Sequence, residues 1–357
     1  MSNFDPTMSI LLLPISFLYH IILSIRHKLY DWHIMRSKRY AQPVICVGNL
    51  SLGGTGKTPH IEHLIRLLSD PYTVCVISRG YGRKTKGFQL ATSNCTAETI
   101  GDEPLQLFSK FKDLQVAVDE NRNEAIELMN SQDIPPQVYL LDDAFQHRKT
   151  VAGMNILLTA YGHLYSDDFL VPAGTLRDVR SAAKRAQIVI VTKVPTQEQV
   201  DTASLRRQLR LQENQQLYLS SLLYKPLKPI NKAALQQEDS LSEGMSALCF
   251  TGIADPAPLL THLRETGFDT HEMRFADHHS FRGNDIQQLL QRFQAIPNQD
   301  KILVTTEKDY ARLTNSPYLC QFDSVPLFVA PVRIHIHEEE KFNNEILSYV
   351  RKNSQHR

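Results

Sequence analysis

The segment GNLSLGGTGKTPH at residues 48–60 is the feature that most constrains the fold of this chain. Phosphate-binding loops read G-x-x-x-x-G-K-[ST]. The last three letters are present here, and Ser51 stands where the first glycine is expected. A β-branched run at 44–48 precedes the loop, and residues 58–69 carry apolar side chains at helical spacing. A strand, a glycine loop and a helix in this order predict a phosphate site in an α/β fold.

The glycines of this loop indicate how it would hold phosphate. Glycine adopts positive φ and has no side chain, so backbone N–H groups can turn toward an anion. Lys57 would neutralise the β and γ phosphates, and the Thr58 hydroxyl would face Mg²⁺. Because GGTGKT is intact, we expect the serine at its start to be tolerated. The expected nucleotide-contacting residues are Ser51, Gly53, Gly54, Thr55, Gly56, Lys57 and Thr58.

Further hydrophobic runs alternate with helical stretches along the first two thirds of the chain. The expected strands cover 72–78, 114–119, 137–143, 154–159 and 187–193. Strands that alternate with helices predict a mainly parallel sheet with helices on both faces, an α/β fold of the P-loop NTPase type.

The length of 357 residues exceeds the roughly 100 to 200 residues of one domain. At 222–232 two prolines and three lysines interrupt the pattern, which indicates a boundary. We expect an N-terminal segment over 1–40, a P-loop core over 41–225 and a smaller α/β lobe over 226–357 that contributes to the active-site cleft. Within that lobe the expected strands are 246–253, 268–275, 301–309 and 326–334, with helices from 258, over 284–293 and up to 352.

Residues 10–25 are almost uncharged, and a basic stretch follows them. A secretory signal needs positive charge before its apolar run, but Asp5 precedes this one, so we expect the segment to be retained. It is shorter than the ~20 residues of a span and contains Pro14, which favours a helix lying in the membrane interface. An ordinary core helix and a true membrane-spanning helix stay open as alternatives for this segment. The basic residues that would face lipid phosphates are Arg26, Lys28, Arg36, Lys38 and Arg39.

The composition excludes some classes of binding partner. A net charge of +1 gives no overall basic field for nucleic acid. The five cysteines have no C-x-x-C spacing, so we interpret them as reduced thiols and not as a disulfide framework or a zinc site. Nothing in the sequence implies an obligate protein partner.

The run VYLLDD at 138–143 is a hydrophobic strand that ends in Asp142 and Asp143. Adjacent acids at a buried strand end repel each other unless a cation lies between them. Such a pair is often an exposed turn, but behind a phosphate loop it favours a metal. We therefore expect Asp142, Asp143 and Thr58 at the Mg²⁺ end of the site.

Two further clusters carry charge. RGYGR follows an expected strand and would bring Arg79, Tyr81 and Arg83 to the same sheet edge, which suits an anionic or sugar-bearing substrate. GDEP places Asp102 and Glu103 at the start of an expected helix, where a helix cap is the simpler interpretation. The alternative makes Asp102 a catalytic base.

Together these motifs resemble one family. GNLSLGGTGKTP, SRGYGR, GDEP, LLDDAFQHR, PAGTLRD, FADHH and TEKD occur in the order seen in tetraacyldisaccharide 4′-kinases. The resemblance runs from the N-terminal helix to about residue 310. It implies transfer of the γ-phosphoryl of ATP, with Mg²⁺, to the 4′-hydroxyl of a tetraacyldisaccharide 1-phosphate, giving lipid IVA for lipid A. It also implies a membrane-embedded glycolipid substrate and a place on the cytoplasmic face of a Gram-negative inner membrane.

The resemblance also assigns site residues. Asp102 would be the base and would pair with a histidine of FADHH, for which we take His278 over His279. Lys57 would act on the transferred group, and Glu103, His147 and Arg177 would join Arg79, Tyr81 and Arg83 around the substrate. The chain departs from the family where L-R-E-P is common, because Asp178 replaces the glutamate, and at Ala144, where glycine is usual.

Two other functions stay open. A membrane-associated regulatory P-loop ATPase of the partitioning type also carries G-G-x-G-K-T, but it has a lysine just before the two glycines, where this chain has Leu52. A nucleotide-binding scaffold without chemistry would make Asp102 and His278 incidental. ATP turnover measured with and without the acceptor separates these functions.

Overall fold

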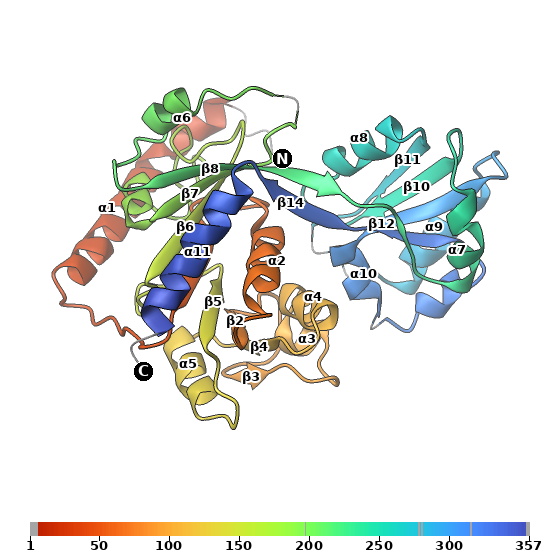
Figure 1. The fold of residues 1–357 in the computed structure, drawn as a ribbon. Helices are drawn as coiled ribbons and strands as arrows, with labels where there is room; N and C mark the ends of the chain where they lie inside the picture. The colour runs from red at the N-terminus through yellow and green to blue at the C-terminus, as the bar shows by residue number, and fades with distance from the viewer. Residues whose placement is uncertain (1–5, 197, 278, 280, 315, 355–357) are drawn as a thin grey trace.

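The computed structural model describes residues 6–196, 198–277, 279, 281–314 and 316–354. These residues build two sheets flanked by helices, and a long N-terminal helix, α1 (Pro6–Asp31), lies along the first sheet (Figure 1). The expected α/β class is confirmed. The five cysteines are free in this structure.

The first sheet has the strand order β14-β8-β7-β6-β1-β5-β2-β4-β3. Its strands pair in parallel except at the edges, where β3 and β14 run antiparallel to β4 and β8. A mainly parallel sheet was the expectation, and it is confirmed. The strands are β1 (Val44–Asn49), β2 (Val74–Ser78), β3 (Gln89–Leu90), β4 (Gln115–Val118), β5 (Val138–Asp142), β6 (Met154–Ala160), β7 (Ile188–Thr192), β8 (Gln216–Tyr224) and β14 (Val332–Ile336).

Strand β1 shows why this sheet is covered on both faces. All six of its residues are buried; Val44 and Cys46 join one apolar cluster, and Ile45 and Val47 join the other. A strand buried on both sides reads as a continuous apolar run, as β1 does. One face packs on α1, α5 (Arg122–Asn130) and α6 (Thr202–Gln208), the other on α2 (Lys57–Leu68), α4 (Asp102–Lys110) and α11 (Glu339–Ser354), with α3 (Ala97–Ile100) and η1 (Arg180–Arg185) in connections.

The second sheet has the order β11-β10-β12-β13-β9 and is parallel except for β9. Its apolar clusters place α7 and α8 on one face and α9 and α10 on the other. The elements are β9 (Lys228–Pro229), α7 (Lys232–Gln237), η2 (Glu238–Ser240), β10 (Ser246–Thr251), α8 (Ala257–Glu265), β11 (Asp269–Arg274), α9 (Gly283–Gln294), β12 (Lys301–Thr306), α10 (Glu307–Thr314), η3 (Leu319–Phe322) and β13 (Leu327–Ala330).

Two expected strands end earlier than the apolar pattern suggested. The run at 326–334 is split by Pro331 into β13 and β14, which belong to different sheets. The run at 301–309 ends at Thr306, because the Thr306 hydroxyl accepts from the N–H of Asp309 at 3.1 Å and so opens α10. A threonine followed three residues later by an acid is a helix-start signal.

The chain crosses between the sheets twice. It leaves the first sheet after β8 and returns through β13 and β14, and the N–H of Lys225 donates to the carbonyl of Pro331 at 2.9 Å where the two segments pass (Figure 1). Segment 226–357 thus contains elements of both sheets. We propose that the second lobe comprises about 228–330, and that β14 and α11 complete the core predicted over 41–225.

Candidate active site

The phosphate loop lies between β1, which ends at Asn49, and α2, which begins at Lys57. Gly56 has a φ of 81°, a left-handed conformation that a side chain would strain. The loop thus turns directly into the N-terminus of α2, where unpaired N–H groups and the helix dipole favour an anion. The backbone of Ser51 forms an isolated antiparallel bridge with Leu176, which ties the start of the loop to the segment that carries Arg177.

Three side chains outside the G-x-x-x-x-G-K-[ST] pattern, those of Asn49, His60 and Thr192, hold this loop in place. Asn49 Nδ2 donates to Thr55 Oγ1 at 2.8 Å, and Thr192 Oγ1 donates to the Thr55 carbonyl at 2.9 Å. His60 Nδ1 lies 2.7 Å from the Gly56 carbonyl, and its Nε2 lies 3.0 Å from the hydroxyl of Ser220 on β8. Burial lowers the pKa of His60 to about 4, so the ring is neutral. Sequence reasoning missed these supports because nothing local marks them.

Asp142 is the last residue of β5 and pairs in register with Val47 of β1, beside the loop. It is 3% exposed, and the Ser78 hydroxyl donates to its Oδ2 at 3.3 Å. Burial, with the charges of Glu103 and Asp143, raises the pKa of Asp142 to about 7. Its Oδ1 has no hydrogen-bond partner among the described residues. A buried carboxylate oxygen in this state suits a hard cation or its water.

Asp143 has a different environment. Both arms of the Arg177 guanidinium bond its carboxylate, NH1 to Oδ2 at 2.9 Å and NH2 to Oδ1, and Lys57 Nζ lies 3.8 Å from Oδ1. Burial pushes the pKa of Asp143 up, but the Arg177 hydrogen bonds and the Lys57 charge outweigh it, and the net pKa is lowered. The positive φ in this segment, 49°, is at Asp143 and not at Ala144. Residue 144 therefore does not need glycine, and alanine is tolerated there.

The GDEP segment opens α4, as predicted. Asp102 Oδ2 accepts from Arg312 Nε at 2.7 Å, and Glu103 Oε1 accepts from Lys308 at 3.2 Å. Glu103 is close enough to Asp142 to raise its pKa, so the structure brings GDEP near the carboxylate that ends β5.

The histidine expected beside Asp102, His278, lies outside the described residues. Its neighbour His279 is described, and its Nε2 lies 2.9 Å from Asp285 Oδ2. The preference for His278 over His279 therefore stays a prediction.

The RGYGR loop packs against GDEP. A side chain on Gly101 would meet the Tyr81 carbonyl at 2.9 Å, so glycine is required where the two loops touch. Tyr81 is 77% exposed and Arg79 is also exposed. The Arg83 side chain is 3% exposed, and its NH2 lies 2.8 Å from Glu120. Arg79 and Tyr81 are thus accessible to a substrate, whereas Arg83 is buried beneath the loop.

Two further cationic or polar groups lie near the carboxylate pair, His147 on the loop after β5 and Arg122 at the start of α5. Burial and the charges of Arg122, Lys149 and Arg26 lower the pKa of His147 to about 4, and its Nε2 has no partner among the described residues. Arg122, which the motifs did not indicate, is 3% exposed, and its positive charge acts on both Asp142 and Asp143. His147 and Arg122 therefore extend the charged site beyond the carboxylate pair.

A family model described as LpxK, tetraacyldisaccharide-1-P 4′-kinase, matches residues 8–351. The chain belongs to this family. A tetraacyldisaccharide 4′-kinase of Bacteroides thetaiotaomicron is 44% identical over 355 residues, which cover 96% of this chain and 93% of the relative. One of Flavobacterium johnsoniae is 43% identical over 350 residues, 96% of this chain and 97% of the relative. The resemblance drawn from the motifs is confirmed.

A solved structure agrees with the family. The "apo" form of LpxK from Aquifex aeolicus in complex with ATP is 28% identical, with a TM-score of 0.72, over 96% of this chain and 99% of that chain. The mostly parallel sheet with helices on both faces is therefore shared with a 4′-kinase relative.

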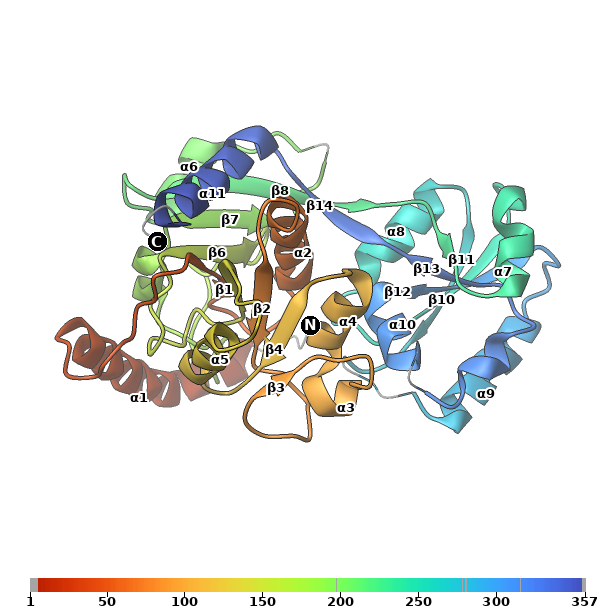
Figure 2. The same ribbon diagram turned by 60° about the horizontal axis from the view of Figure 1, so that its bottom comes forward.

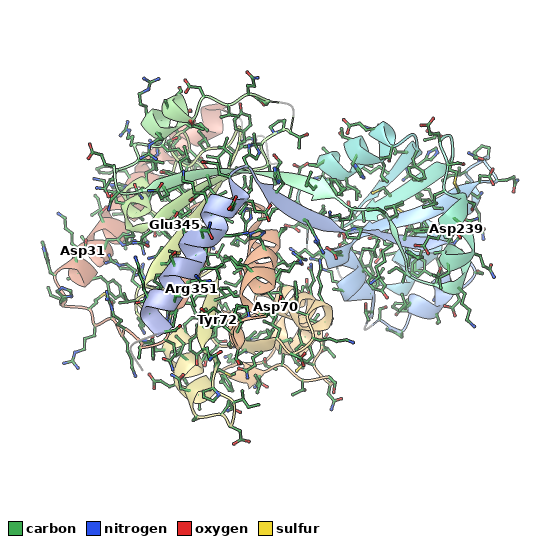
Figure 3. The ribbon with its side chains drawn as sticks, viewed as in Figure 1. Asp31, Asp70, Tyr72, Asp239, Glu345 and Arg351 are labelled. Atoms are coloured by element: carbon green, nitrogen blue, oxygen red, sulfur yellow. The ribbon has the colours of Figure 1, made fainter. Side chains whose placement is uncertain are left out.

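In this 4′-kinase family member, Asp178 anchors helix α1. Asp178 is fully buried and lies 2.6 Å from His27 Nε2, while Arg185 approaches its other oxygen at 3.4 Å. Arg148 donates to His27 Nδ1 at 3.1 Å and to Asp31 at 2.7 Å, where α1 ends (Figure 3). The aspartate that departs from the common L-R-E-P pattern thus joins α1 to the core.

Leu23 and Tyr30 of α1 are buried in the protein, but much of the rest of this helix has the opposite arrangement. Polar groups face the protein, as when the Ser16 hydroxyl donates to the Leu170 carbonyl at 2.9 Å, and large apolar side chains face outward. In the described part of the chain, no helix is long and apolar enough to cross a membrane. Exposed residues on successive turns are Leu11, Ile15, Leu18, Ile22 and Ile25, which we call the α1 stripe.

Proposed function

We propose that this chain carries out the reaction of its family. It is an ATP-dependent phosphotransferase that acts on a sugar hydroxyl, the 4′-hydroxyl of a tetraacyldisaccharide 1-phosphate, to give lipid IVA in lipid A biosynthesis. The observation that carries this function is the meeting of Lys57, Asp142 and Asp143 at adjoining ends of β1 and β5. Phosphoryl transfer depends on positioning and charge neutralisation, which such a group supplies.

ATP is the nucleotide, as in the related solved structure. We assign its phosphates to the loop residues Ser51, Gly53, Gly54, Thr55 and Gly56, with Lys57 and Thr58 at the start of α2. The support for this assignment is the left-handed Gly56 and the fixed Thr55 carbonyl, because both hold the loop open to an anion before it arrives.

Mg²⁺ would be held by Thr58, Asp142 and Asp143. The donor set is hard oxygen, which Mg²⁺ prefers, and one or two carboxylates are usual where phosphates complete the shell. The buried Oδ1 of Asp142, without a hydrogen-bond partner among the described residues, supports the fit. When bound, the ion would neutralise charge on the phosphates.

The proton of the acceptor hydroxyl passes to the carboxylate of Asp102, with His278 as its expected partner. The 4′-oxygen forms a bond to the γ-phosphorus, the bond between that phosphorus and the bridging oxygen breaks, and ADP leaves. Lys57 stabilises the charge on the transferred group. Glu103, Arg79, Tyr81, His147 and Arg177 are assigned to the substrate side, and buried Arg83 supports the loop that carries Tyr81.

We also propose that the α1 stripe lies in the cytoplasmic face of the inner membrane. A helix with exposed apolar residues and a basic flank suits an interfacial position, and the acyl chains of the substrate stay in the bilayer. The double change Leu18→Asp and Ile22→Asp tests this without disturbing His27. Reduced sedimentation with anionic vesicles is expected, with Glu124→Gln on exposed α5 surface as a control; full sedimentation of the double variant would reject the proposal.

The test of function is ATP turnover with and without the tetraacyldisaccharide acceptor. Turnover that requires the acceptor and yields a 4′-phosphorylated product is expected. Acceptor-independent hydrolysis would favour the regulatory ATPase, and no turnover in either case would favour a scaffold.

The test of the base is Asp102→Ala. A general base contributes typically ~10²- to 10⁴-fold, so kcat is expected to fall by about this factor. The affinity for ATP should stay close to that of the unchanged chain, because Asp102 is not assigned to the nucleotide. Near-normal kcat would reject Asp102 as the base.

A further inference from the structure

We propose that Arg312 is a positioning residue for the reaction: from the second sheet, it holds the carboxylate of Asp102 in place. The inference rests on the proposed function, in which Asp102 receives the acceptor proton. It gives a role to the TEKD helix α10, which the function described so far leaves without one.

The contacts of Arg312 make it a bridge between lobes. Its Nε donates to Asp102 Oδ2 at 2.7 Å, and its NH1 donates to Asp309 Oδ1 at 2.7 Å and to the carbonyl of Gly252 at 3.0 Å. The Arg312 side chain is 5% exposed, so these bonds form away from bulk water. The second lobe therefore sets the position of the guanidinium, and the guanidinium reaches into the first lobe.

Asp309 fixes the other end of this bridge. Its side chain is fully buried, and its Oδ2 accepts from the Thr306 hydroxyl at 2.7 Å. Burial raises the pKa of Asp309, and the charge of Arg312 opposes that rise. A continuous chain of bonds thus runs from the end of β12, through Asp309 and Arg312, to the first residue of α4.

Arg312 is placed to bond two acids from different lobes. The positive charge of Arg312 faces two carboxylates, those of Asp102 and Asp309. Arg312 is shared with Asp309, whose carboxylate offsets part of that charge. The planar fork of arginine bonds both acids at once, which the point charge of lysine does less well. Asp102 is thereby oriented by a guanidinium that the second lobe holds in place.

Helices α4 and α10 lie side by side in both ribbon views (Figures 1 and 2). Other ion pairs join them: Lys308 to Glu103 at 3.2 Å, and Glu307 to Lys110 at 2.6 Å. The Glu307 pair crosses between the same two helices without touching Asp102. It therefore offers a matched control that separates lobe docking from positioning of the base.

The experiment compares Arg312→Gln, Arg312→Lys and Glu307→Gln with Asp102→Asn, each in the full chain. Phosphoryl transfer is measured with ATP and the acceptor in mixed micelles. A small misplacement of a reacting group costs up to ~10²-fold, so Arg312→Gln should lower kcat about 10- to 100-fold. KM for ATP should change little, Arg312→Lys should recover part of kcat, and Glu307→Gln should stay near normal.

A double variant tests whether Arg312 acts through Asp102. If it does, Arg312→Gln combined with Asp102→Asn has the same kcat as Asp102→Asn alone, because residues that act as a unit are not additive. A double variant well below Asp102→Asn would overturn the inference. Equal losses in Arg312→Gln and Glu307→Gln would also overturn it, since Arg312 would then only dock the lobes.

Failure of the proposed function gives a different result. Normal kcat in Asp102→Asn would reject the base assignment and the inference with it, whereas low kcat in Asp102→Asn beside normal kcat in Arg312→Gln rejects the inference alone. If Arg312→Gln does not fold, as judged by its thermal transition, Arg312→Lys decides. Arg312→Lys keeps the positive charge but loses the planar guanidinium. Normal kcat and KM in that variant would overturn the inference that the guanidinium positions Asp102.

Discussion

The proposed phosphate end and the proposed acceptor end of the site are held in different ways. At the phosphate end, Lys57, Asp142 and Arg177 all come from the first sheet and its connections. At the acceptor end, Asp102 and Glu103 open a helix of the first sheet, but their partners Arg312 and Lys308 come from the second. One end is fixed by neighbouring strands, and the other is fixed by how the two sheets dock.

This difference concerns how firmly each end is preorganised. Parallel strands place their carboxyl ends at one edge, so the spacing between loop and carboxylates follows from backbone pairing. Ion pairs between lobes depend on interfaces that resemble transient contacts between proteins. We therefore expect the loss of Lys57 at the phosphate end to lower kcat more than the loss of a cation that joins the two lobes, Lys308 or Arg312.

Lys57→Met, compared with Lys308→Met, should show the largest contrast. Removing a preorganised group that stabilises transition-state charge costs about 10²- to 10³-fold in kcat, and this loss is expected for Lys57. Lys308 belongs to a partly exposed pair, which is worth little in water, so its loss should be about tenfold or less. The two variants are compared by their steady-state kcat at saturating acceptor. Similar losses for both lysines would contradict the expected difference between the two ends.

Arg177→Gln should follow with a smaller effect at the same end. The change removes both bonds to Asp143 and frees that carboxylate to move, which is expected to lower kcat about 10- to 100-fold. Arg177→Lys should recover only part of it, because one ammonium does not bond both oxygens in the same geometry. Arg180→Gln is the control, since that arginine donates to the Asp168 carbonyl outside the site. Full recovery by lysine would mean that charge alone matters.

The phosphate end could be predicted well from the sequence because its signals are local. The GGTGKT loop, the strand before it and the DD pair at the end of 138–143 each follow from short-range patterns, and the sheet brings them together as parallel pairing requires. The pattern also gave β1, β2, β4, β5, β6 and β7 to within a few residues, but it predicted no strand at β3 or β8, and it placed β14 in the second lobe.

The acceptor end could be predicted only in part. Asp102 was identified, but its partner Arg312 is 210 residues away and lies on a helix of another sheet, a contact that no local pattern encodes. The same holds for His60 and Ser220, which are 160 residues apart. Pro331 divides one apolar run between two sheets, because proline cannot donate a backbone hydrogen bond within a sheet. The sequence marks this break, but it does not indicate which sheet the next strand joins.

The smallest expected effect concerns His147, on the loop that follows β5, and the pH dependence of stability. Its pKa is lowered to about 4 by burial and by nearby arginines and lysine, whereas in the unfolded chain a histidine titrates near ~6.5. Between these values the unfolded state binds a proton that the folded state does not, so stability is complete above about pH 6.5 and falls as the pH drops toward 4.

His147→Gln should remove this contribution, so that the variant loses less stability than the unchanged chain over the same window. The ring is partly exposed, and the difference is expected to be about 1 kcal/mol or less after screening. Thermal unfolding from pH 7.5 to 4.5 measures it, with exposed His163→Gln as the control. Parallel curves for the two variants would show that the environment of His147 does not disfavour its proton. The effect of the buried positive charge of Arg122 on its neighbours would then be weaker than its position beside the carboxylates implies.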